Sequence, residues 1–198
     1  MNHPNDKNPE IRTENTESDR NDANGPRGTD RRFGRKPVFT ITFLGLAAAL
    51  IFAATLLMIP SGLGYMNFGD GMILLCAYLF GPWVFFPAAI GSALSDLALG
   101  YTVYIPATFV IKGLLGLCAG LILRKSEPSV KRKAFAFAVA ETIMVGGYFL
   151  FEGLMYGFAV AAAQVPANLI QAVAAIAVAS VLTVALRKFR SYTRLLKD

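Results

Sequence analysis

Histidine and cysteine are scarce in this chain. Its single histidine, His3, lies in a polar N-terminal stretch, and its two cysteines, Cys76 and Cys118, lie inside apolar runs. The apolar part therefore has no histidine for a metal site or for Ser–His or Cys–His catalysis. Two cysteines do not make a disulfide framework, so we interpret both as small buried hydrophobic residues. We expect no metal site and no cofactor.

Motifs for nucleotide hydrolysis and for common hydrolases are absent as well. The chain holds no G-x-x-x-x-G-K-[ST] phosphate loop, no H-E-x-x-H helix and no G-x-S-x-G elbow. ATP hydrolysis through a phosphate loop is therefore excluded, and we do not expect an enzyme. Any uphill transport by this chain would need energy supplied by another protein.

Charge is also sparse and unevenly distributed. Only 16% of the residues are charged, whereas 55% are hydrophobic, which is too apolar for an ordinary soluble domain. Residues 1–36 are almost wholly polar. We expect them to form a disordered tail, because they cannot bury enough apolar surface to offset their chain entropy. Residues 37–198 are predicted to form one membrane domain.

Six apolar stretches in the membrane domain predict an all-α fold with six transmembrane helices. The predicted spans are residues 37–59, 70–80, 83–99, 107–123, 134–159 and 166–186. A helix needs about 20 apolar residues to cross the hydrocarbon core, so the second stretch is short for a span. Loops that contain Gly or Pro separate the first spans, beginning with residues 60–69.

Basic residues predict how these helices are oriented. Three clusters precede the first span, join the fourth to the fifth, and follow the sixth: Arg31, Arg32, Arg35 and Lys36; Arg124, Lys125, Lys131, Arg132 and Lys133; Arg187, Lys188, Arg190, Arg194 and Lys197. The opposite loops, 60–69, 100–106 and 160–165, contain no Lys or Arg. The positive-inside rule then predicts that both termini are cytoplasmic. We interpret the net charge of +6 as a topology signal that also favours anionic lipid, not as nucleic-acid binding.

One acid and one base interrupt the apolar run around the third and fourth spans. Asp96 and Lys112 both fall in the outer third of their helices in the predicted topology. An ionised group that faces lipid costs at least about 2.5–3.5 kcal/mol, so such groups usually turn inward and find partners. Two interpretations stay open: a salt bridge between Asp96 and Lys112, or a pocket in which one or both contact a small molecule.

Other polar side chains at helical spacing also favour a pocket near the outer surface. Residues three or four apart share a helix face, which applies to Asn168 with Gln171 and to Tyr148 with Glu152 and Tyr156. Asp70, at the outer start of the second span, is a further candidate. Glu141 lies in the inner half of the fifth span, and we interpret it as structural or as a partner contact.

Small residues recur on the first span. Gly45, Ala49 and Ala53 follow one another at intervals of four, and this spacing lets another helix approach closely. The partner could be a helix of this chain or of another protein.

Four segments, taken in order, resemble a known family of membrane proteins. They read FGDGMILLCAYLFGP, SDLALGY, PATFVIKGLLGLCAGL and VPANLIQ, within residues 40–186. Together they resemble the substrate-binding S components of energy-coupling factor (ECF) vitamin transporters, in particular the riboflavin type. The polar tail lies outside this resemblance.

The resemblance implies a division of labour in a bacterial-type plasma membrane. An S component captures a vitamin or vitamin precursor outside and works with a transmembrane T component and two cytoplasmic ABC ATPases. It implies that Gly45, Ala49 and Ala53 pack on the T component. It also implies a pocket in the outer halves of the later helices, closed by the loop after the first. Here the pocket residues would be Asp96, Lys112, Tyr148, Glu152, Asn168 and Gln171, with Tyr65 and Asn67 on the lid.

The substrate stays open between a riboflavin-like compound and a pyrimidine- or pyridine-type precursor. The alternative function is a membrane scaffold or assembly protein of similar six-helix shape. In that case Asp96, Lys112 and Glu152 would matter only for stability.

Overall fold

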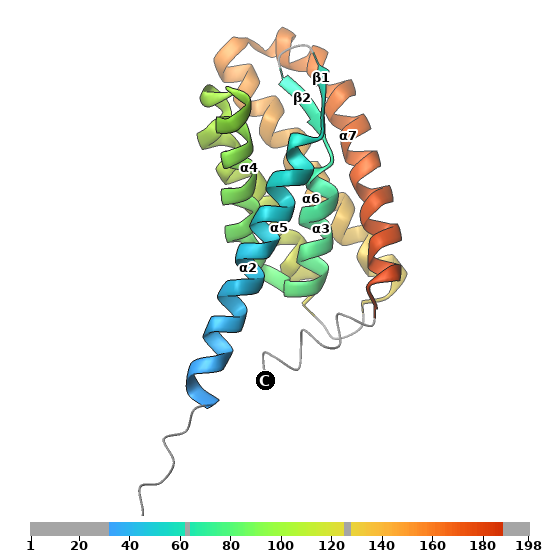
Figure 1. The fold of residues 1–198 in the computed structure, drawn as a ribbon. Coiled ribbons are helices and arrows are strands. Elements are labelled where there is room, and N and C mark those ends of the chain that lie inside the picture. The colour runs from blue at the N-terminus through green and yellow to red at the C-terminus, as the bar shows by residue number, and fades with distance from the viewer. Residues whose placement is uncertain (1–31, 62–63, 125–127, 188–198) are drawn as a thin grey trace, which may run out of the picture. The chain divides into compact units, whose positions relative to one another are not determined.

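The computed structural model describes residues 32–61, 64–124 and 128–187 (Figure 1). Its helices are α2 (Arg32–Leu56), α3 (Gly69–Phe80), α4 (Phe85–Leu99), α5 (Ile105–Ile122), α6 (Val130–Tyr156) and α7 (Phe158–Ala185). Two short 3-10 helices, η2 (Gly81–Val84) and η3 (Thr102–Tyr104), precede α4 and α5. From Val38 onward these elements belong to one compact unit. The predicted tail up to residue 31, Lys125 and the basic residues after Arg187 lie outside the described residues.

Four helical stretches in the described part of the chain are long and apolar enough to cross a membrane. They are Gly69–Leu99, Thr102–Ile122, Val130–Tyr156 and Phe158–Ala185. The first of them combines α3, η2 and α4, which the sequence counted as two spans. A shorter apolar helix, Ile41–Leu56, forms most of α2. A mainly helical fold with several helices long and apolar enough to cross a membrane is thus confirmed, whereas the count of six spans and the side of the termini stay predictions.

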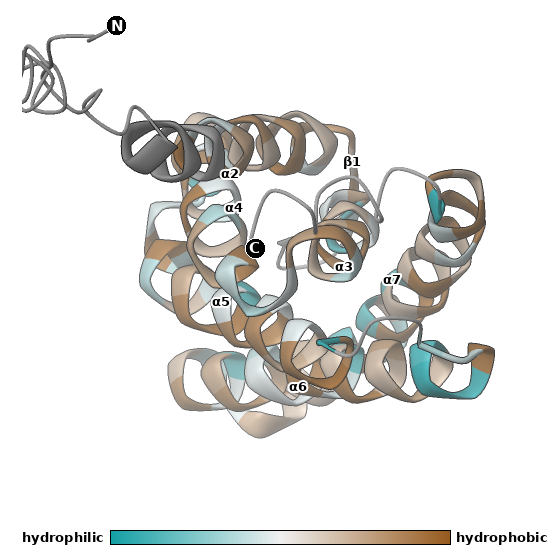
Figure 2. Cartoon of the chain, turned by 90° about the horizontal axis from the view of Figure 1, so that it is seen from below, coloured by the Kyte–Doolittle hydropathy of each residue, from teal (hydrophilic) through white to brown (hydrophobic). Residues whose placement is uncertain are grey.

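The short helix α3 lies inside the bundle. Figure 2 looks along the bundle and shows α3 surrounded by the other helices. Ten of its 12 residues are buried, which explains why α3 is apolar on every side. At 1.5 Å per residue it is about 18 Å long, well below the roughly 30 Å thickness of the hydrocarbon core.

Close contact between α2 and α4 depends on Gly91. A Cβ atom at this position would lie 2.6 Å from the backbone oxygen of Ala48 on α2 and 3.3 Å from the side chain of Ile51. Real Cβ atoms are essentially never this close to backbone oxygen, so only glycine lets the two helices approach to this distance. This contact positions the C-terminal part of α2, which leads into the segment that covers the site.

A β-hairpin follows α2 where the sequence predicted a loop at residues 60–69. Strand β1 (Met58–Ser61) pairs antiparallel with β2 (Gly64–Asn67), so that Met58 lies opposite Asn67 and Pro60 opposite Tyr65. The loop prediction was therefore wrong for most of this segment. Glycine and proline indicated a turn, but neighbouring residues such as Ile59 and Tyr65 favour extended backbone.

The connection between the last two helices also differs from expectation. The predicted loop 160–165 is helical, and the chain instead turns at Gly157, whose φ is +94°. Pro166, which was taken as the start of the last span, lies inside α7. Glycine adopts positive φ at little cost, whereas proline lacks only one backbone donor in a helix that neighbouring helices support.

Two ends of the bundle differ in what they carry. The hairpin, η3 and the turn between α6 and α7 lie together at one end (Figure 1). The connection between α5 and α6 lies at the other end. There Ser129 caps α6 by accepting a hydrogen bond from the backbone of Arg132, at 3.3 Å. Arg132, with Arg124, Lys131 and Lys133, is therefore far from the hairpin.

Candidate functional site

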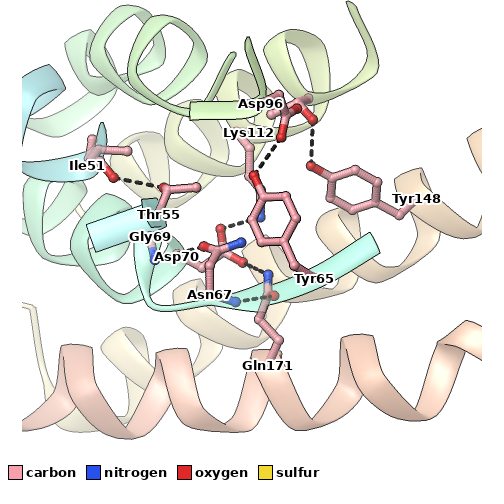
Figure 3. Close-up of polar contacts among 11 residues, drawn as sticks. Ile51, Thr55, Tyr65, Asn67, Gly69, Asp70, Asp96, Lys112, Tyr148 and Gln171 are labelled. Carbon is pink, nitrogen blue, oxygen red and sulfur yellow. Dashed lines mark hydrogen bonds and ion pairs between the residues drawn. The ribbon is translucent and has the colours of Figure 1, made fainter. Parts of the chain in front are cut away.

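A buried ion pair joins α3 to α5 just below the hairpin. Lys112 Nζ lies 2.5 Å from Asp70 Oδ1, and the two side chains are 3% and 0% exposed. Gln171 on α7 donates a hydrogen bond from Nε2 to Asp70 Oδ2, also at 2.5 Å. Both oxygens of Asp70 are therefore hydrogen-bonded, as a buried ion pair requires if it is to offset lost hydration. Three helices meet at Asp70 (Figure 3).

The salt bridge between Asp96 and Lys112, one of the two interpretations of the sequence, does not form. Lys112 binds Asp70, while Asp96 Oδ1 accepts a hydrogen bond from the hydroxyl of Tyr65 at 2.6 Å. Depth along a helix indicated that Asp96 and Lys112 lie at a similar level. It did not indicate that α3, buried beside α5, presents Asp70 to the lysine.

Two hydrogen bonds to side chains of α4 and α7 hold the hairpin on the bundle. One is the hydrogen bond from Tyr65 to Asp96 on α4. In the other, Gln171 Oε1 on α7 accepts a hydrogen bond from the backbone N–H of Asn67 at 2.9 Å. Burial, and then the hydrogen bond to Asp96 and its charge, raise the pKa of Tyr65 above the ordinary value for a phenol. The phenol is therefore protonated at neutral pH and remains a donor.

Aromatic side chains surround the space beneath the hairpin. Tyr104 is the centre of this group, with ring centroids 6.4 Å from Tyr148 and 5.3 Å from Phe151. Tyr65 lies 4.9 Å from Tyr101 by the same measure. The hydroxyl of Tyr148 is 2.9 Å from that of Thr108 on α5. Aromatic faces at these separations provide a flat, apolar surface with hydroxyl groups at its edge.

A small cavity lies between these groups. Its free space, as the volume open to the centre of a water molecule, is about 40 Å³. Four buried polar atoms that border the cavity have no hydrogen-bond partner among the described residues: Ser92 Oγ, Asp96 Oδ2, Glu152 Oε2 and Asn168 Nδ2. Buried polar groups are usually paired, so this concentration indicates a place where a solute or water supplies the missing partners.

The structure brings the eight residues that the resemblance implies for the pocket and lid to this one cavity, whereas Asp70 and Tyr156, the other candidates from the sequence, do not line it. Its lining includes Asp96, Lys112, Tyr148, Glu152, Asn168 and Gln171 from four helices, together with Tyr65 and Asn67 from β2. These are the eight residues that the sequence analysis proposed. Their convergence is a finding, and their role in binding a ligand stays a prediction. Asp70 contacts two of these eight residues, Lys112 and Gln171.

Six further lining residues were missed by the sequence analysis. They are Thr55, Ser92, Tyr101, Tyr104, Thr108 and Gln164. Helical spacing could have found four of them. Tyr104 and Thr108 precede Lys112 at intervals of four, Ser92 precedes Asp96 by four, and Gln164 precedes Asn168 by four. The sequence offered no comparable signal for Thr55, whose hydroxyl bonds to the backbone oxygen of Ile51 at 2.8 Å.

Glu141 is a third buried acid with unpaired oxygens, and it lies outside this cavity. It is 2% exposed, and neither of its carboxylate oxygens has a hydrogen-bond partner among the described residues. With Thr142 and apolar side chains of α6 and α7 it borders a groove of about 580 Å³ between the two helices. Its interpretation as structural or as a partner contact stays a prediction.

The small-residue stripe of α2 faces away from the bundle. Gly45, Ala49 and Ala53 are exposed, and a Cβ at Gly45 would meet no atom within 4 Å. The opposite face of α2 is buried through Ala47 and Ile51. Packing within the chain's own bundle, one of the two interpretations of this stripe, is therefore wrong.

The family model described as ECF-type riboflavin transporter, S component, matches residues 36–188. The chain belongs to this family. An S component is the membrane subunit of a vitamin-type transporter, and the apolar helices of this one mark it as a multi-pass protein of the plasma membrane.

Two relatives of this S component are similar over most of their length. A Pyrococcus woesei protein, named only as an uncharacterized protein in a gap 3' region, is 37% identical over 131 residues. These residues cover 66% of the present chain and 87% of the relative. The thiamine precursor transporter HmpT of Lactococcus lactis subsp. cremoris (strain MG1363) is 32% identical over 155 residues, or 75% of this chain and 87% of HmpT.

Proposed function

We propose that the chain captures a vitamin or vitamin precursor in the cavity beneath the hairpin and delivers it across the membrane. The proposal names a riboflavin-like or a pyrimidine- or pyridine-type compound as substrate. The observation that supports it most is the set of four unpaired polar atoms around one cavity in a member of this family. The family model names riboflavin, and one relative is named for a thiamine precursor, so both substrate types have support.

In this proposal the hairpin end faces outward. The described basic residues of the connection between α5 and α6 lie at the opposite end of the bundle. Lys and Arg are enriched in cytoplasmic loops, which favours a cytoplasmic position for that end and for both termini. The hairpin then acts as the lid over an outward-facing cavity, held by Tyr65 and Asn67.

The energy for delivery comes, in this proposal, from a T component and two cytoplasmic ATPases. The chain carries no phosphate loop, so the energy has to reach it through protein contact. The exposed stripe of Gly45, Ala49 and Ala53 on α2 is the proposed surface for the T component. Small residues allow two helix backbones to approach closely in a membrane, where packing drives association.

The alternative, a structural scaffold, fits the cavity less well. A scaffold would gain stability from pairing its buried polar groups, because each buried group without a partner costs about 1–3 kcal/mol. Asp96 and Glu152 each keep one oxygen without a partner beside the cavity. Buried acids with an unpaired oxygen are retained more readily in a binding site, where a ligand can supply the missing partner, than in a purely structural contact.

Binding titrations on the purified full chain in nanodiscs test the proposal. The panel contains riboflavin, thiamine, aminopyrimidines, nicotinamide and nicotinate, and calorimetry reports affinity for each. Native mass spectrometry of the chain purified from cells reports a retained small molecule. We expect one of these compounds to bind with a dissociation constant in the micromolar range or below. If no compound in the panel binds and none is retained, the proposal is wrong.

Copurification separates transport from a scaffold role. An affinity-tagged chain, extracted gently from its native membrane, should bring down a T component and ATPase subunits. A tagged chain that binds a vitamin but never recovers these partners would contradict the proposed mode of energy supply.

A further inference from the structure

The start of α3 is tied to the hairpin by the chain itself and by hydrogen bonds. Asp70 is the second residue of α3 and follows Asn67, the last residue of β2, by three positions. The side chain of Asn67 accepts a hydrogen bond from the backbone N–H of Gly69 at 2.8 Å. Gln171 bonds both to the backbone of Asn67 and to Asp70 (Figure 3). A movement of the hairpin that breaks the bond between Asn67 and Gln171 should therefore displace Asp70 as well.

Such a movement would separate the buried ion pair, because the hairpin connects α2 to α3 and not to α5, the helix that carries Lys112. The ammonium group of Lys112 has three donors. A single hydrogen bond, to Asp70, is found for it among the described residues. A base without an acid is costly inside a membrane, so the lysine needs a second partner whenever Asp70 moves away.

Glu141 on α6 has the position and the unused oxygens for this role. It is 2% exposed, and neither carboxylate oxygen has a hydrogen-bond partner among the described residues. It is nevertheless close enough to Asp70 and Lys112 to interact with both charges. Because α6 packs against α5 and is not joined to the hairpin, Glu141 should stay beside the lysine when Asp70 moves.

We propose that Glu141 is the reserve partner of Lys112, and that the lysine exchanges Asp70 for Glu141 when the hairpin opens far enough to release Gln171. The inference takes the hairpin as the lid of the proposed function. While the lid is closed, Glu141 carries a proton, since an ionised carboxylate without a partner is costly in a membrane. When the lid opens, this proton passes to Asp70, which has lost its base, and Glu141 binds the ammonium group. The net charge of the three groups is the same before and after the exchange.

Asp96 also interacts with Lys112, but it suits the role less well. One of its oxygens accepts the hydrogen bond of Tyr65 at 2.6 Å, and its side chain borders the cavity that an open lid exposes to water. Water can then supply partners to this carboxyl group. Glu141 lies outside the cavity and gains no such partner, so the exchange stabilises Glu141 more than Asp96.

Variants of the two acids test the exchange. Asp70→Asn imitates the loss of the first partner, and Glu141→Met removes the reserve, because methionine has a similar length but accepts no strong hydrogen bond. Infrared difference spectra of the full chain in nanodiscs, without ligand, show whether a carboxyl group carries a proton. Asp96→Asn and Glu152→Gln are the controls, since each removes another buried acid. Each substitution is made in the wild type and in Asp70→Asn, and thermal unfolding verifies that each variant folds.

The infrared spectra should show that Glu141 loses its proton when Asp70 is replaced. In the wild type, Glu141→Met should remove the band of a protonated carboxyl group. In the Asp70→Asn background it should remove the bands of an ionised carboxylate instead. Asp96→Asn and Glu152→Gln should each remove the same bands in both backgrounds.

Hydrogen–deuterium exchange of the Asn67 amide measures the wide opening of the lid, because this N–H donates to Gln171 when the lid is closed. In Glu141→Met the open state leaves Lys112 without an acid. The amide should therefore exchange more slowly than in the wild type, by up to about 10- to 150-fold, the factor for losing a hydrogen bond to a charged group. A purely structural effect of the substitution would change exchange in α6 around residue 141 and not at the hairpin.

Three outcomes would overturn the inference. They are a protonated Glu141 in folded Asp70→Asn, a proton lost by Asp96 in place of Glu141, or an Asn67 amide that exchanges in Glu141→Met as fast as in the wild type or faster. If Asp70→Asn does not fold, the exchange of the Asn67 amide decides alone. If Glu141→Met does not fold, Glu141→Gln replaces it in both measurements. Neither measurement uses a ligand, so the vitamin titrations test the proposed function independently.

Discussion

Removal of one hydroxyl group from the hairpin should loosen the lid. Tyr65→Phe keeps the ring and its contact with Tyr101 but deletes the donor to Asp96, which lies 2.6 Å away. A hydrogen bond to a charged group contributes about 1.5–3 kcal/mol. The opening equilibrium of the hairpin should therefore increase by at most about 10- to 150-fold.

The second anchor keeps the effect local. The backbone N–H of Asn67 still bonds to Gln171 in the variant, at 2.9 Å in the present structure. The bundle below is held by the Lys112–Asp70 pair, which the substitution does not touch. Opening should thus increase in the hairpin without a comparable loss of global stability.

Hydrogen–deuterium exchange of the ligand-free chain measures this opening. Amides of β1 and β2 should exchange faster in Tyr65→Phe, while those of α3 and α5 should keep their wild-type rates. Tyr101→Phe is the control, because no hydrogen bond of its hydroxyl is found among the described residues. Equal hairpin exchange in wild type and Tyr65→Phe, or an equal rise in Tyr101→Phe, would refute the role of the Tyr65 hydroxyl.

Three further predictions concern stability and assembly. Lys112→Met should lower the free energy of unfolding by about 3–5 kcal/mol, because it leaves Asp70 buried without its base; the added change Asp70→Asn should restore part of this in denaturant unfolding. Gly91→Ala should destabilise by about 1–3 kcal/mol through its clash with α2, whereas Gly146→Ala, with no atom within 4 Å, should not lower the melting temperature. Ala49→Leu, on the exposed face of α2, should preserve folding and ligand binding but reduce recovery of the T component; unchanged recovery would contradict the proposed interface.

The helical fold was predictable because its signals are local. Apolar runs and their lengths located most helices, and a basic loop marked the connection between α5 and α6. The errors occur where local signals have two meanings. Pro166 was taken as the start of a helix, although it lies inside α7, and the break depends on Gly157 with its positive φ. The hairpin was missed because the glycine and proline residues of this segment indicate a turn, although the segment also forms two paired strands.

The candidate site was predictable as a location but not as a network. Helical spacing and depth indicated that acids, amides and tyrosines converge at one end, and the structure brings them to one cavity. Which side chains pair depends on which helices are neighbours and on how each helix is rotated about its axis. The depth of a residue along its helix indicates neither of these. The sequence therefore left the Asp96–Lys112 salt bridge as one open interpretation and did not indicate Asp70 as the partner of Lys112, because that pairing depends on the buried position of α3 beside α5.

The buried charged and amide groups of the site fall into two sets with different physical roles. Asp70, Lys112 and Gln171 satisfy one another, and Gln171 also holds the hairpin through Asn67. Asp96 and Glu152 retain unused oxygens beside the cavity. A membrane helix keeps a buried charge at lowest cost when the charge is fully paired, so the unused oxygens are the expensive feature of this chain. Because Lys112 is paired with Asp70, the two acids that line the cavity, Asp96 and Glu152, form no salt bridge with a described residue, and each keeps an oxygen that a ligand or water can reach with a hydrogen-bond donor.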